Sequence, residues 1–400
     1  MNYLEKLLQG APVEWKTLGE IGNFYGGLTG KSKKDFEQGN AKYITYMNVF
    51  TNIATDLDSE NWVKVGDEER QNKIAYKDIL FTGSSETPNE CGMTSVVNQP
   101  IAEDIYLNSF CFGFRFDSEF IDIFDPDFLK YLFRGNLLRR EITRTANGVT
   151  RFNISKKKME KIKIPIPPLP VQKEIARILD AFTAITSELT SELTLRQKQY
   201  QHYRDKLLTF GDEVEWKTLG EVCENLDSKR KPITSGLREK GDIPYYGASG
   251  IVDYVKDYIF EGDYLLVSED GANLLARNTP IAFSISGKNW VNNHAHVLKF
   301  ENDTERKFIE FYLNNLDLTP YISGAAQPKL NKQNLNSIRI PNLSLEAKTK
   351  IVDILDKFDS LTNSISEGLP KEIALRQKQY EYYRDLLLNF KQDEASLSPS

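Results

Sequence analysis

Hydrophobic positions in two long segments of the chain alternate in spacings of four and three residues, which is the pattern of a coiled-coil seam. The first seam, on a helix expected at about 171–208, consists of Ile175, Leu179, Phe182, Thr186, Leu189, Leu193, Arg196, Tyr200, Tyr203 and Leu207. The second seam consists of Ile351, Leu355, Phe358, Thr362, Ile365 and Leu369. The proline-rich PIPPLP at 165–170 predicts the start of the first helix, whereas Gly368 and Pro370 predict a kink or break in the second. We expect the two helices to pair antiparallel; a dimerisation coiled coil is the alternative, since heptads do not identify the partner helix.

Short sequence motifs recur in the two halves of the chain. VEWKTLGE stands at 13–20 and 214–221, LRQKQY stands at 195–200 and 375–380, and IKIP at 162–165 becomes IRIP at 338–341. Such recurrence predicts a duplicated architecture. The segments 22–150 and 222–325 between these motifs share little sequence. This contrast is explained by a constant frame, made of the recurring motifs and the long helices, that carries two interchangeable variable domains (the readers). Plain duplication followed by divergence would be expected to change the frame as well.

The N-terminal YLEKLL at 3–8 resembles YRDKLL at 203–208 and YRDLLL at 383–388. The chain therefore begins with the tail of a frame helix, and we expect its first residues to pack beside the last helix. The predicted fold is α+β, with two mixed α/β domains separated by two long helices in a circular, pseudo-two-fold repeat. The predicted divisions are a frame fragment at 1–12, a first domain at 13–166, a central spacer at 167–211, a second domain at 212–341, a C-terminal spacer at 342–392 and a disordered tail at 393–400.

Composition favours a cytoplasmic protein without a membrane span. No run of 18 apolar residues occurs, the N-terminus lacks the features of a secretory signal, and Cys91, Cys111 and Cys223 form no disulfide framework. The formal net charge of −6 argues against a uniformly basic nucleic-acid binder.

Basic charge is nevertheless concentrated locally. The segment 139–163 has nine Lys or Arg against two Glu, a local charge of +7, and contains GVTRFNISKKK. Three further segments combine basic residues with turn formers: GLTGKSKK at 27–34, DSKRKPI at 227–233 and GAAQPKLNKQN at 324–334, the last standing where GVTRFNISKKK stands in the first half. Each run alone is typical of a solvated surface. Their recurrence at equivalent places favours nucleic-acid binding, because Arg, Lys, Asn and Ser contact phosphates and base edges.

Catalytic motifs are incomplete. YGGLTGKS at 25–32 has Tyr25 where a P-loop needs glycine, and His294 with His296 lacks the further ligands of a zinc site. The sequence contains no GxGxxG, no Asn-Pro-Pro-aromatic motif and no convincing Ser-His-Asp order. We therefore expect a chain without chemistry of its own. Two alternatives stay open: a non-catalytic coiled-coil adaptor or DNA-binding scaffold, and a nucleotide-binding enzyme built on 25–32.

Several longer motifs resemble one family across the whole chain. PPLPVQKEIARILDAF at 167–182, LRQKQYQHYRDKLL at 195–208 and LSLEAKTKIVDILDKF at 343–358 are similar to the specificity (S) subunit of a type I restriction-modification system. YYGASGIVDYV at 245–255 and WVNNHAHVLKF at 290–300 resemble one type of target recognition domain, and ITYMNVFTN at 44–52 with GVTRFNISKKK resembles another. The tandem TSELTSEL at 186–193 resembles the subgroup with four-residue repeats in the central spacer.

This resemblance implies a DNA-reading subunit that carries no catalytic residues. Each recognition domain would read one half of an asymmetric bipartite DNA site, and the helix pair would set the gap. Two methyltransferase (M) subunits, which would flip the target adenine, and restriction (R) subunits would dock on the frame. S-adenosylmethionine, ATP and magnesium would bind to those partners and not to this chain, which would have no metal or cofactor and no membrane contact.

The candidate DNA-binding residues are basic side chains for phosphates and polar side chains for bases. In the first domain they are Lys31, Lys33, Lys34, Asn48, Arg144, Thr150, Arg151 and Asn153. In the second they are Lys229, Arg230, Lys231, Tyr246, Ser249, Asn273, Arg277, Asn293, His294, His296, Lys329 and Asn331.

Overall fold

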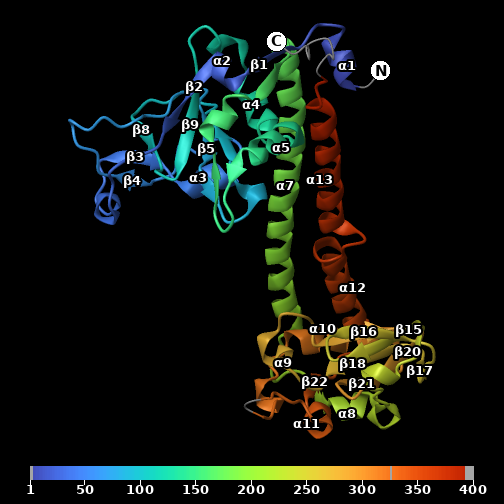
Figure 1. Cartoon of the computed structure of the whole chain (residues 1–400). Coiled ribbons are helices and arrows are strands. Elements are labelled where there is room, and N and C mark those ends of the chain that lie inside the picture. Colours follow the sequence, from blue (N-terminus) through green and yellow to red (C-terminus); the bar gives the residue numbers. More distant parts are fainter. Residues whose placement is uncertain (1–2, 325–326, 392–400) are drawn as a thin grey trace. The chain divides into compact units, whose positions relative to one another are not determined.

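A computed structural model describes residues 3–324 and 327–391 of the chain (Figure 1). It divides into two compact units. Unit 1 comprises Met1–Glu188 and Ala374–Ser400, and unit 2 comprises Leu189–Ile373. The long helix α7 (Leu169–Leu208) contributes its first half to unit 1 and its second half to unit 2. The disordered tail expected at 393–400 lies outside the described residues.

Unit 1 is built on a four-stranded antiparallel sheet in the order β2-β9-β5-β7, beside a three-stranded sheet in the order β4-β3-β8 whose β3 and β8 are parallel. The strands of these sheets are β2 (Gly22–Gly26), β9 (Cys111–Phe116), β5 (Ile79–Thr82), β7 (Thr94–Val96), β4 (Trp62–Val63), β3 (Ala41–Ile44) and β8 (Ile105–Leu107). The smaller pairings join β1 (Glu14–Thr17) to β12 (Lys163–Ile166), and β11 (Phe152–Ile154) to both β10 (Ala146–Asn147) and β6 (Ser84–Ser85). The helices are α1 (Tyr3–Leu8), α2 (Leu18–Ile21), α3 (Tyr46–Thr51), α4 (Pro126–Leu132), α5 (Asn136–Arg144) and α6 (Lys156–Met159).

Unit 2 repeats this plan. Its antiparallel sheet has the order β14-β21-β18-β19, and its mixed sheet has the order β16-β15-β20-β17 with β15 and β20 parallel. The strands are β14 (Glu224–Asn225), β21 (Ala295–Lys299), β18 (Tyr264–Ser268), β19 (Ala282–Ile285), β16 (Gly250–Val255), β15 (Lys240–Gly247), β20 (Lys288–Val291) and β17 (Phe260–Glu261), with β13 (Trp216–Thr218) pairing β22 (Arg339–Pro341). The helices are α8 (Leu219–Val222), α9 (Asn273–Ala276), α10 (Asp303–Asn315), α11 (Lys332–Asn336) and α12 (Leu345–Thr362).

The repeated sequence motifs form the same local structure in both units. VEWKTLGE begins as β1 and continues as α2 in unit 1, and as β13 and α8 in unit 2. Each copy has a capping box, in which the Thr17 amide donates to Glu20 (2.6 Å) and the Thr218 amide donates to Glu221 (2.7 Å). IKIP and IRIP supply β12 and β22, the partners of those strands. The predicted duplication is therefore confirmed.

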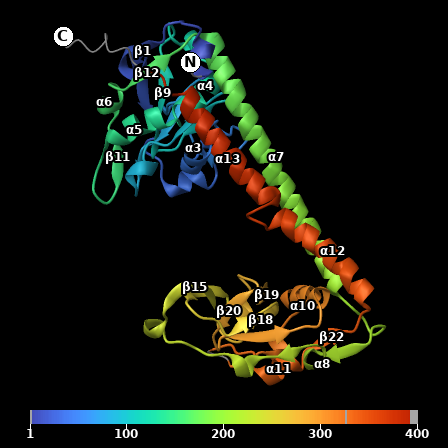
Figure 2. The ribbon, with the colours of Figure 1, turned by 90° about the vertical axis from the view of Figure 1, so that its right-hand side faces the viewer.

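The frame helices pack into the core of each unit. In unit 1, Ile175 and Leu179 of α7 are fully buried in one cluster with Leu387 of α13 (Gly368–Leu387), and α13 lies beside α7 (Figures 1 and 2). Phe182 stacks on Tyr383 with ring centroids 5.2 Å apart. These contacts are the hydrophobic face that the seam predicted for this part of α7. Leucine side chains of α1 join the same cluster, which confirms that the first residues pack beside the last helix.

Unit 2 uses the second half of α7 in the same way. Tyr200 stacks on Phe358 of α12 with ring centroids 6.0 Å apart, and Leu355 is fully buried in the same cluster. An ion pair ties domain to frame at equivalent places: Lys130 of α4 contacts Asp180 in unit 1 (2.7 Å), as Lys307 of α10 contacts Asp356 in unit 2.

The second frame segment is two helices and not one. Helix α12 ends at Thr362 and α13 begins at Gly368, whose φ of +73° only glycine adopts readily. Pro370 then lies in the first turn of α13, where its missing N–H costs nothing. The predicted break is confirmed. The continuation of the seam through it was wrong, because Ile365 lies in the non-helical link and is 91% exposed.

Candidate nucleic-acid interface

The two basic, glycine-containing segments lie at the same edge of their units. In unit 1, β11 runs beside β6, with Asn153 opposite Ser84, and the Ile154 amide donates to the carbonyl of Gly83 (3.0 Å). In unit 2, the bridge partners are Lys329 and Asp270, and the Leu330 amide donates to the carbonyl of Glu269 (2.8 Å). Each segment is thus bonded to the residues that directly follow β5 or β18, which are Gly83 and β6 in unit 1 and Glu269 and Asp270 in unit 2. Ala325 and Ala326 of the second segment lie outside the described residues.

Arg151 is the most prominent cation at the unit 1 edge. Its side chain is exposed, its guanidinium lies 5.7 Å from the centroid of the Phe110 ring, and its Nε donates to Ser84 Oγ (3.3 Å). Thr150 and Asn153 are exposed beside it. Ring and hydroxyl together fix the direction of the guanidinium, which leaves a cation and polar groups available to solvent at this edge.

A pocket of about 390 Å³ opens beside Arg151. Helix α3 supplies one wall, including Met47, and the bend that directly follows β6 supplies Glu86. Met47 is 57% exposed and Phe110 is 59% exposed, so two large apolar side chains at this pocket are open to solvent. Sequence reasoning did not select Met47, Glu86 or Phe110. The available signal was the position of Met47 within ITYMNVFTN, one of the motifs that resemble a recognition domain.

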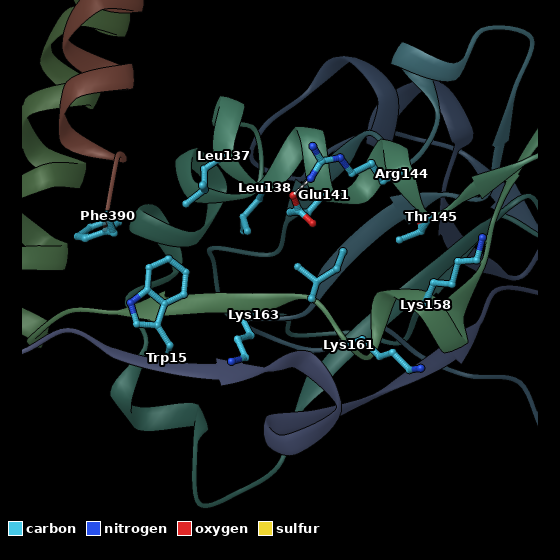
Figure 3. Close-up of a pocket in the computed structure, with 11 residues that line it drawn as sticks. Trp15, Leu137, Leu138, Glu141, Arg144, Thr145, Lys158, Lys161, Lys163 and Phe390 are labelled. Atoms are coloured by element: carbon cyan, nitrogen blue, oxygen red, sulfur yellow. Dashed lines mark hydrogen bonds and ion pairs between the residues drawn. The ribbon is translucent and has the colours of Figure 1, made fainter. Parts of the chain in front are cut away.

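A second pocket of unit 1, of about 580 Å³, gathers the basic residues that follow α5 (Figure 3). Lys158, Lys161 and Lys163 line it, and Arg144 turns toward Glu141, with which it forms an ion pair. Its apolar lining includes Trp15, Leu137 and Phe390, so this pocket lies where the frame meets the first domain.

Some basic residues of the segment 139–163 make contacts inside unit 1. Arg139 donates to the backbone carbonyls of Asn89 (2.9 Å) and Cys91 (2.8 Å), and burial lowers its pKa to about 10. Lys156 stands over the Phe112 ring at 5.2 Å. The charge that reaches solvent is therefore smaller than the sequence count.

Two further candidates of unit 1 take part in internal contacts. Lys31 donates to the carbonyl of Lys64 (2.6 Å) and pairs with Glu69, so that its side chain is only 5% exposed. Asn48 is buried, and its amide donates to the Asp56 carbonyl (2.8 Å). Both side chains hold loops in place and do not face solvent.

Lys33 and Lys34 are exposed in the 3₁₀ helix η1 (Lys33–Phe36), which packs beside β4. A short 3₁₀ helix is a poor phosphate cradle compared with the α-helix that follows a P-loop. Together with the ion pair of Lys31, this geometry argues against the nucleotide-binding alternative at 25–32.

A buried ion-pair network supports the edge of unit 2. His296 is fully buried, with Nδ1 2.6 Å from Asp227 Oδ2 and Nε2 2.7 Å from the Leu330 carbonyl. Arg230 donates to Glu269 (2.7 Å) and lies 3.5 Å from Asp227. Burial alone would raise the pKa of Asp227, but the hydrogen bond to His296 and the charge of Arg230 outweigh it and lower that pKa.

Asp227, Glu269 and His296 bring their ligand atoms within 4.8 Å of one another, as a metal site would. However, both ring nitrogens of His296 already face protein acceptors, and Arg230 supplies the charge that balances the carboxylates. The arrangement fits an ion-pair network better than a metal centre. His296 and Arg230, selected as DNA contacts, thus lie inside the unit and position the segment that contains Leu330.

Four other candidates of unit 2 shape its loops. Asn273 closes a turn by donating to the Thr279 carbonyl (2.9 Å), and Arg277, at φ +52°, donates to the Leu316 carbonyl beyond α10 (2.6 Å). Asn331 caps α11. Tyr246 packs against Phe283 with ring centroids 6.1 Å apart, and burial raises the pKa of Tyr246.

The remaining candidates of unit 2 are exposed. His294 is half exposed, with Nδ1 2.9 Å from Asp270, and Lys329 is 51% exposed, with its ammonium 3.2 Å from Glu269. The others with exposed side chains are Lys229, Lys231, Ser249 and Asn293. The edge of unit 2 therefore presents an imidazole and an ammonium, each beside a carboxylate, where unit 1 presents Arg151 on Phe110.

Comparisons with known proteins agree on one family. The family model described as the type I restriction modification DNA specificity domain matches residues 12–196 and again 211–375. A putative type I restriction enzyme specificity subunit of Haemophilus influenzae is 43% identical over 196 residues, which cover 48% of this chain and half of that protein. The EcoR124I/EcoR124II specificity subunit of Escherichia coli is 33% identical over 437 aligned positions, covering 99% of this chain and 98% of the relative.

Solved structures share the fold at low sequence identity. The S subunit of a type I restriction-modification system from M. genitalium has a TM-score of 0.55 and 17% identity, covering 98% of this chain and all of that one. A chain from a study of complex assembly and conformational transition of the type I R-M system has a TM-score of 0.57 and 16% identity, covering 94% of this chain and 98% of that one. Because the family model matches most of the chain in two copies, this protein belongs to the type I restriction-modification DNA specificity family.

Proposed function

We propose that this chain is the DNA sequence-specificity subunit of a type I restriction-modification complex, in which each unit reads one half of a bipartite DNA site. The observation that supports this most directly is the equivalent edge of the two units. The same backbone bond, from Ile154 to Gly83 and from Leu330 to Glu269, holds two segments of unlike side chains in the same place. A constant support with variable polar groups is what two readers of different sequences require.

The basic and the exposed polar residues at these edges would contact phosphates and base edges of the DNA. The recognition domains would span about 13–166 and 212–341, with frame segments before, between and after them. The net charge of −6 is compatible with this role, since DNA binding depends on local positive charge and not on the total.

Two copies of one partner would dock on the frame. The motif LRQKQY presents the same side chains to solvent in α7 and in α13. Leu195 is 61% exposed, and the equivalent Leu375 is 45% exposed. The Gln-Lys pair of each copy is exposed as well, at 197–198 and at 377–378. A single exposed leucine is ordinary on a protein surface, but the same exposed leucine at equivalent positions in both units fits a repeated protein contact. We infer that this partner is the methyltransferase subunit.

Catalysis would belong to the partners. The methyltransferase subunits would bind S-adenosylmethionine and flip the adenine, and restriction subunits would use ATP and magnesium for translocation and cleavage. This chain would position both on the DNA in the cytoplasm. Among the described residues, no helix is both long and apolar enough for a transmembrane segment.

The test is the methylome of cells that express this chain together with its methyltransferase subunit. We expect one asymmetric bipartite motif with a fixed gap. Replacing the second reader segment, 222–325, with that of a relative should change one half of the motif and keep the other. Methylation without sequence preference would contradict the proposal and would favour an adaptor role for the helices.

Loss of partner binding provides a second test. The double substitution Leu195→Glu and Leu375→Glu should abolish methylation while both units still unfold cooperatively, because these side chains are exposed. Thr194→Glu, next to Leu195 and also exposed, is the matched control and should leave methylation unchanged.

A further inference from the structure

The pocket beside Arg151 combines groups that one base pair would satisfy. Its cation is Arg151, its carboxylates are Glu86 and Glu90, and its apolar walls include Met47 and Phe110. The inference drawn from it rests on the proposed function, because it assumes that the edge of unit 1 faces DNA.

The Arg151 guanidinium is held in one orientation, but its two terminal nitrogens remain available to donate hydrogen bonds. Its Nε donates to Ser84 Oγ (3.3 Å) and its plane lies over the Phe110 ring. Among the residues that the structure describes, none accepts a hydrogen bond from its two terminal nitrogens or pairs with its charge. A guanidinium held in this way presents two parallel N–H donors, and guanine O6 and N7 accept such a pair in the major groove.

Carboxylates at this edge argue for base contact over phosphate contact. Glu86 is exposed directly after β6, and no described residue bonds to its side chain. Glu90 is exposed and accepts from the Thr87 hydroxyl (2.7 Å). A carboxylate facing the sugar–phosphate backbone would be repelled by it, whereas one facing base edges accepts a hydrogen bond from the N4 amino group of cytosine.

The exposed apolar side chains suit the same groove. Met47, from the first turn of α3, and Phe110, from the turn before β9, border the pocket together with the two charges. In a DNA complex they would exclude water from the polar contacts, and the methyl group of an adjacent thymine is the apolar feature they could contact.

We propose that unit 1 reads a G·C pair at this pocket, with Arg151 donating to guanine O6 and N7 and Glu86 accepting from cytosine N4. At the equivalent edge of unit 2, His294 contacts Asp270 and Lys329 contacts Glu269. These residues do not combine an oriented arginine with a carboxylate that has no hydrogen-bond partner, as Arg151 and Glu86 do in unit 1. The two halves of the DNA site therefore differ in the base pair read at this point.

The test compares three variants of the full chain, each expressed with the methyltransferase subunit and analysed by methylome sequencing. Arg151→Lys keeps the positive charge but loses the two-pronged donor. Glu86→Ala removes the acceptor. Glu68→Ala, an exposed glutamate in the loop after β4, is the matched control.

We expect one G·C position in the half-site of unit 1 to lose preference by about fivefold or more in Arg151→Lys and Glu86→Ala, as for loss of one good base contact. The other half-site should not change, and Glu68→Ala should match the natural chain. Exchange of 222–325 identifies the half-site of unit 2, and hence that of unit 1.

A second measurement separates base reading from phosphate binding. Binding of the complex to non-specific DNA should not weaken in Glu86→Ala, because the carboxylate only repels the backbone, and should change little in Arg151→Lys. If both variants keep the natural motif, or if the half-site of unit 1 contains no G·C pair, the inference is overturned while the proposed function stands. If the natural chain gives no motif at all, the proposed function itself fails.

Discussion

Insertion of a third Thr-Ser-Glu-Leu after Leu193 should lengthen the gap between the two DNA half-sites without changing either half. The two existing copies, at 186–193, lie inside α7, which is helical throughout Leu169–Leu208. The last residues of unit 1 in α7 and the first of unit 2 meet within these copies, at Glu188 and Leu189. The insertion therefore separates the units along one continuous helix.

The magnitude follows from helix geometry. Four residues add about 6 Å, which is a little under two base-pair steps of about 3.4 Å, and turn the helix by about 40° beyond one full turn. The seam thus keeps nearly the same face: Thr186, Leu189 and Leu193 are half-buried, whereas Ser187 and Glu188 are exposed.

The other side of the frame can accommodate the change. The link at 363–367 between α12 and α13 is not helical, and a non-helical residue spans up to about 3.3–3.6 Å. Partial straightening of this link would supply the added length, so α12 and α13 need not lose their contacts with α7.

Methylome sequencing measures the result directly. We expect a motif with both halves unchanged and a gap longer by one or two base pairs. The double substitution Thr190→Ala and Ser191→Ala, which keeps the length, should leave the gap unchanged. Altered half-sites with the original gap would show that this segment does not set the spacing.

Three further predictions concern single side chains. Arg151→Ala should weaken DNA binding and reduce the salt slope by at most about one, measured by titration at several salt concentrations; unchanged binding and slope would show that this edge does not face DNA. Because its pKa is lowered in the fold, Asp227 stabilises unit 2 above its unfolded pKa of about 3.9, and this contribution is lost as the pH falls through the lowered value. Asp227→Asn should thus destabilise unit 2 at pH 7 and flatten its acid unfolding curve; equal curves would contradict the role given to His296. Gly113→Ala should lower the free energy of unfolding by about 1–3 kcal/mol, because its Cβ would lie 2.1 Å from the half-buried ring of Tyr25; an unchanged denaturant midpoint would contradict this.

The chemistry of a residue type was a poor guide to its role at the edges. Asn48, Asn331, Arg277 and His296 were selected because Asn, Arg and His bind nucleic acids, yet each bonds within its own unit. The groups that contact bases also cap helices and close loops, since both tasks need short polar hydrogen-bonding side chains. Which task a residue performs depends on whether a partner lies within reach in the fold.

The exposure of Phe110 could not be inferred from its residue type. Phenylalanine is usually buried, but the turn before β9 directs Phe110 to solvent next to Arg151. The partners of that contact are distant in the sequence, so no local pattern connects them.

Local patterns in the amino-acid sequence were enough to indicate the duplicated frame, the long helix, the break near Gly368 and the family resemblance, because exact repeats, heptad spacing and backbone restrictions are local properties of the chain. The three-dimensional fold was needed to show that two segments of unlike sequence have the same strand order in their antiparallel sheets, and that 148–158 and 327–334 lie at equivalent edges of their own units. Backbone strand pairing explains this equivalence. The bonds that join Asn153 to Ser84, or Lys329 to Asp270, connect backbones far apart in the chain and are independent of side-chain identity.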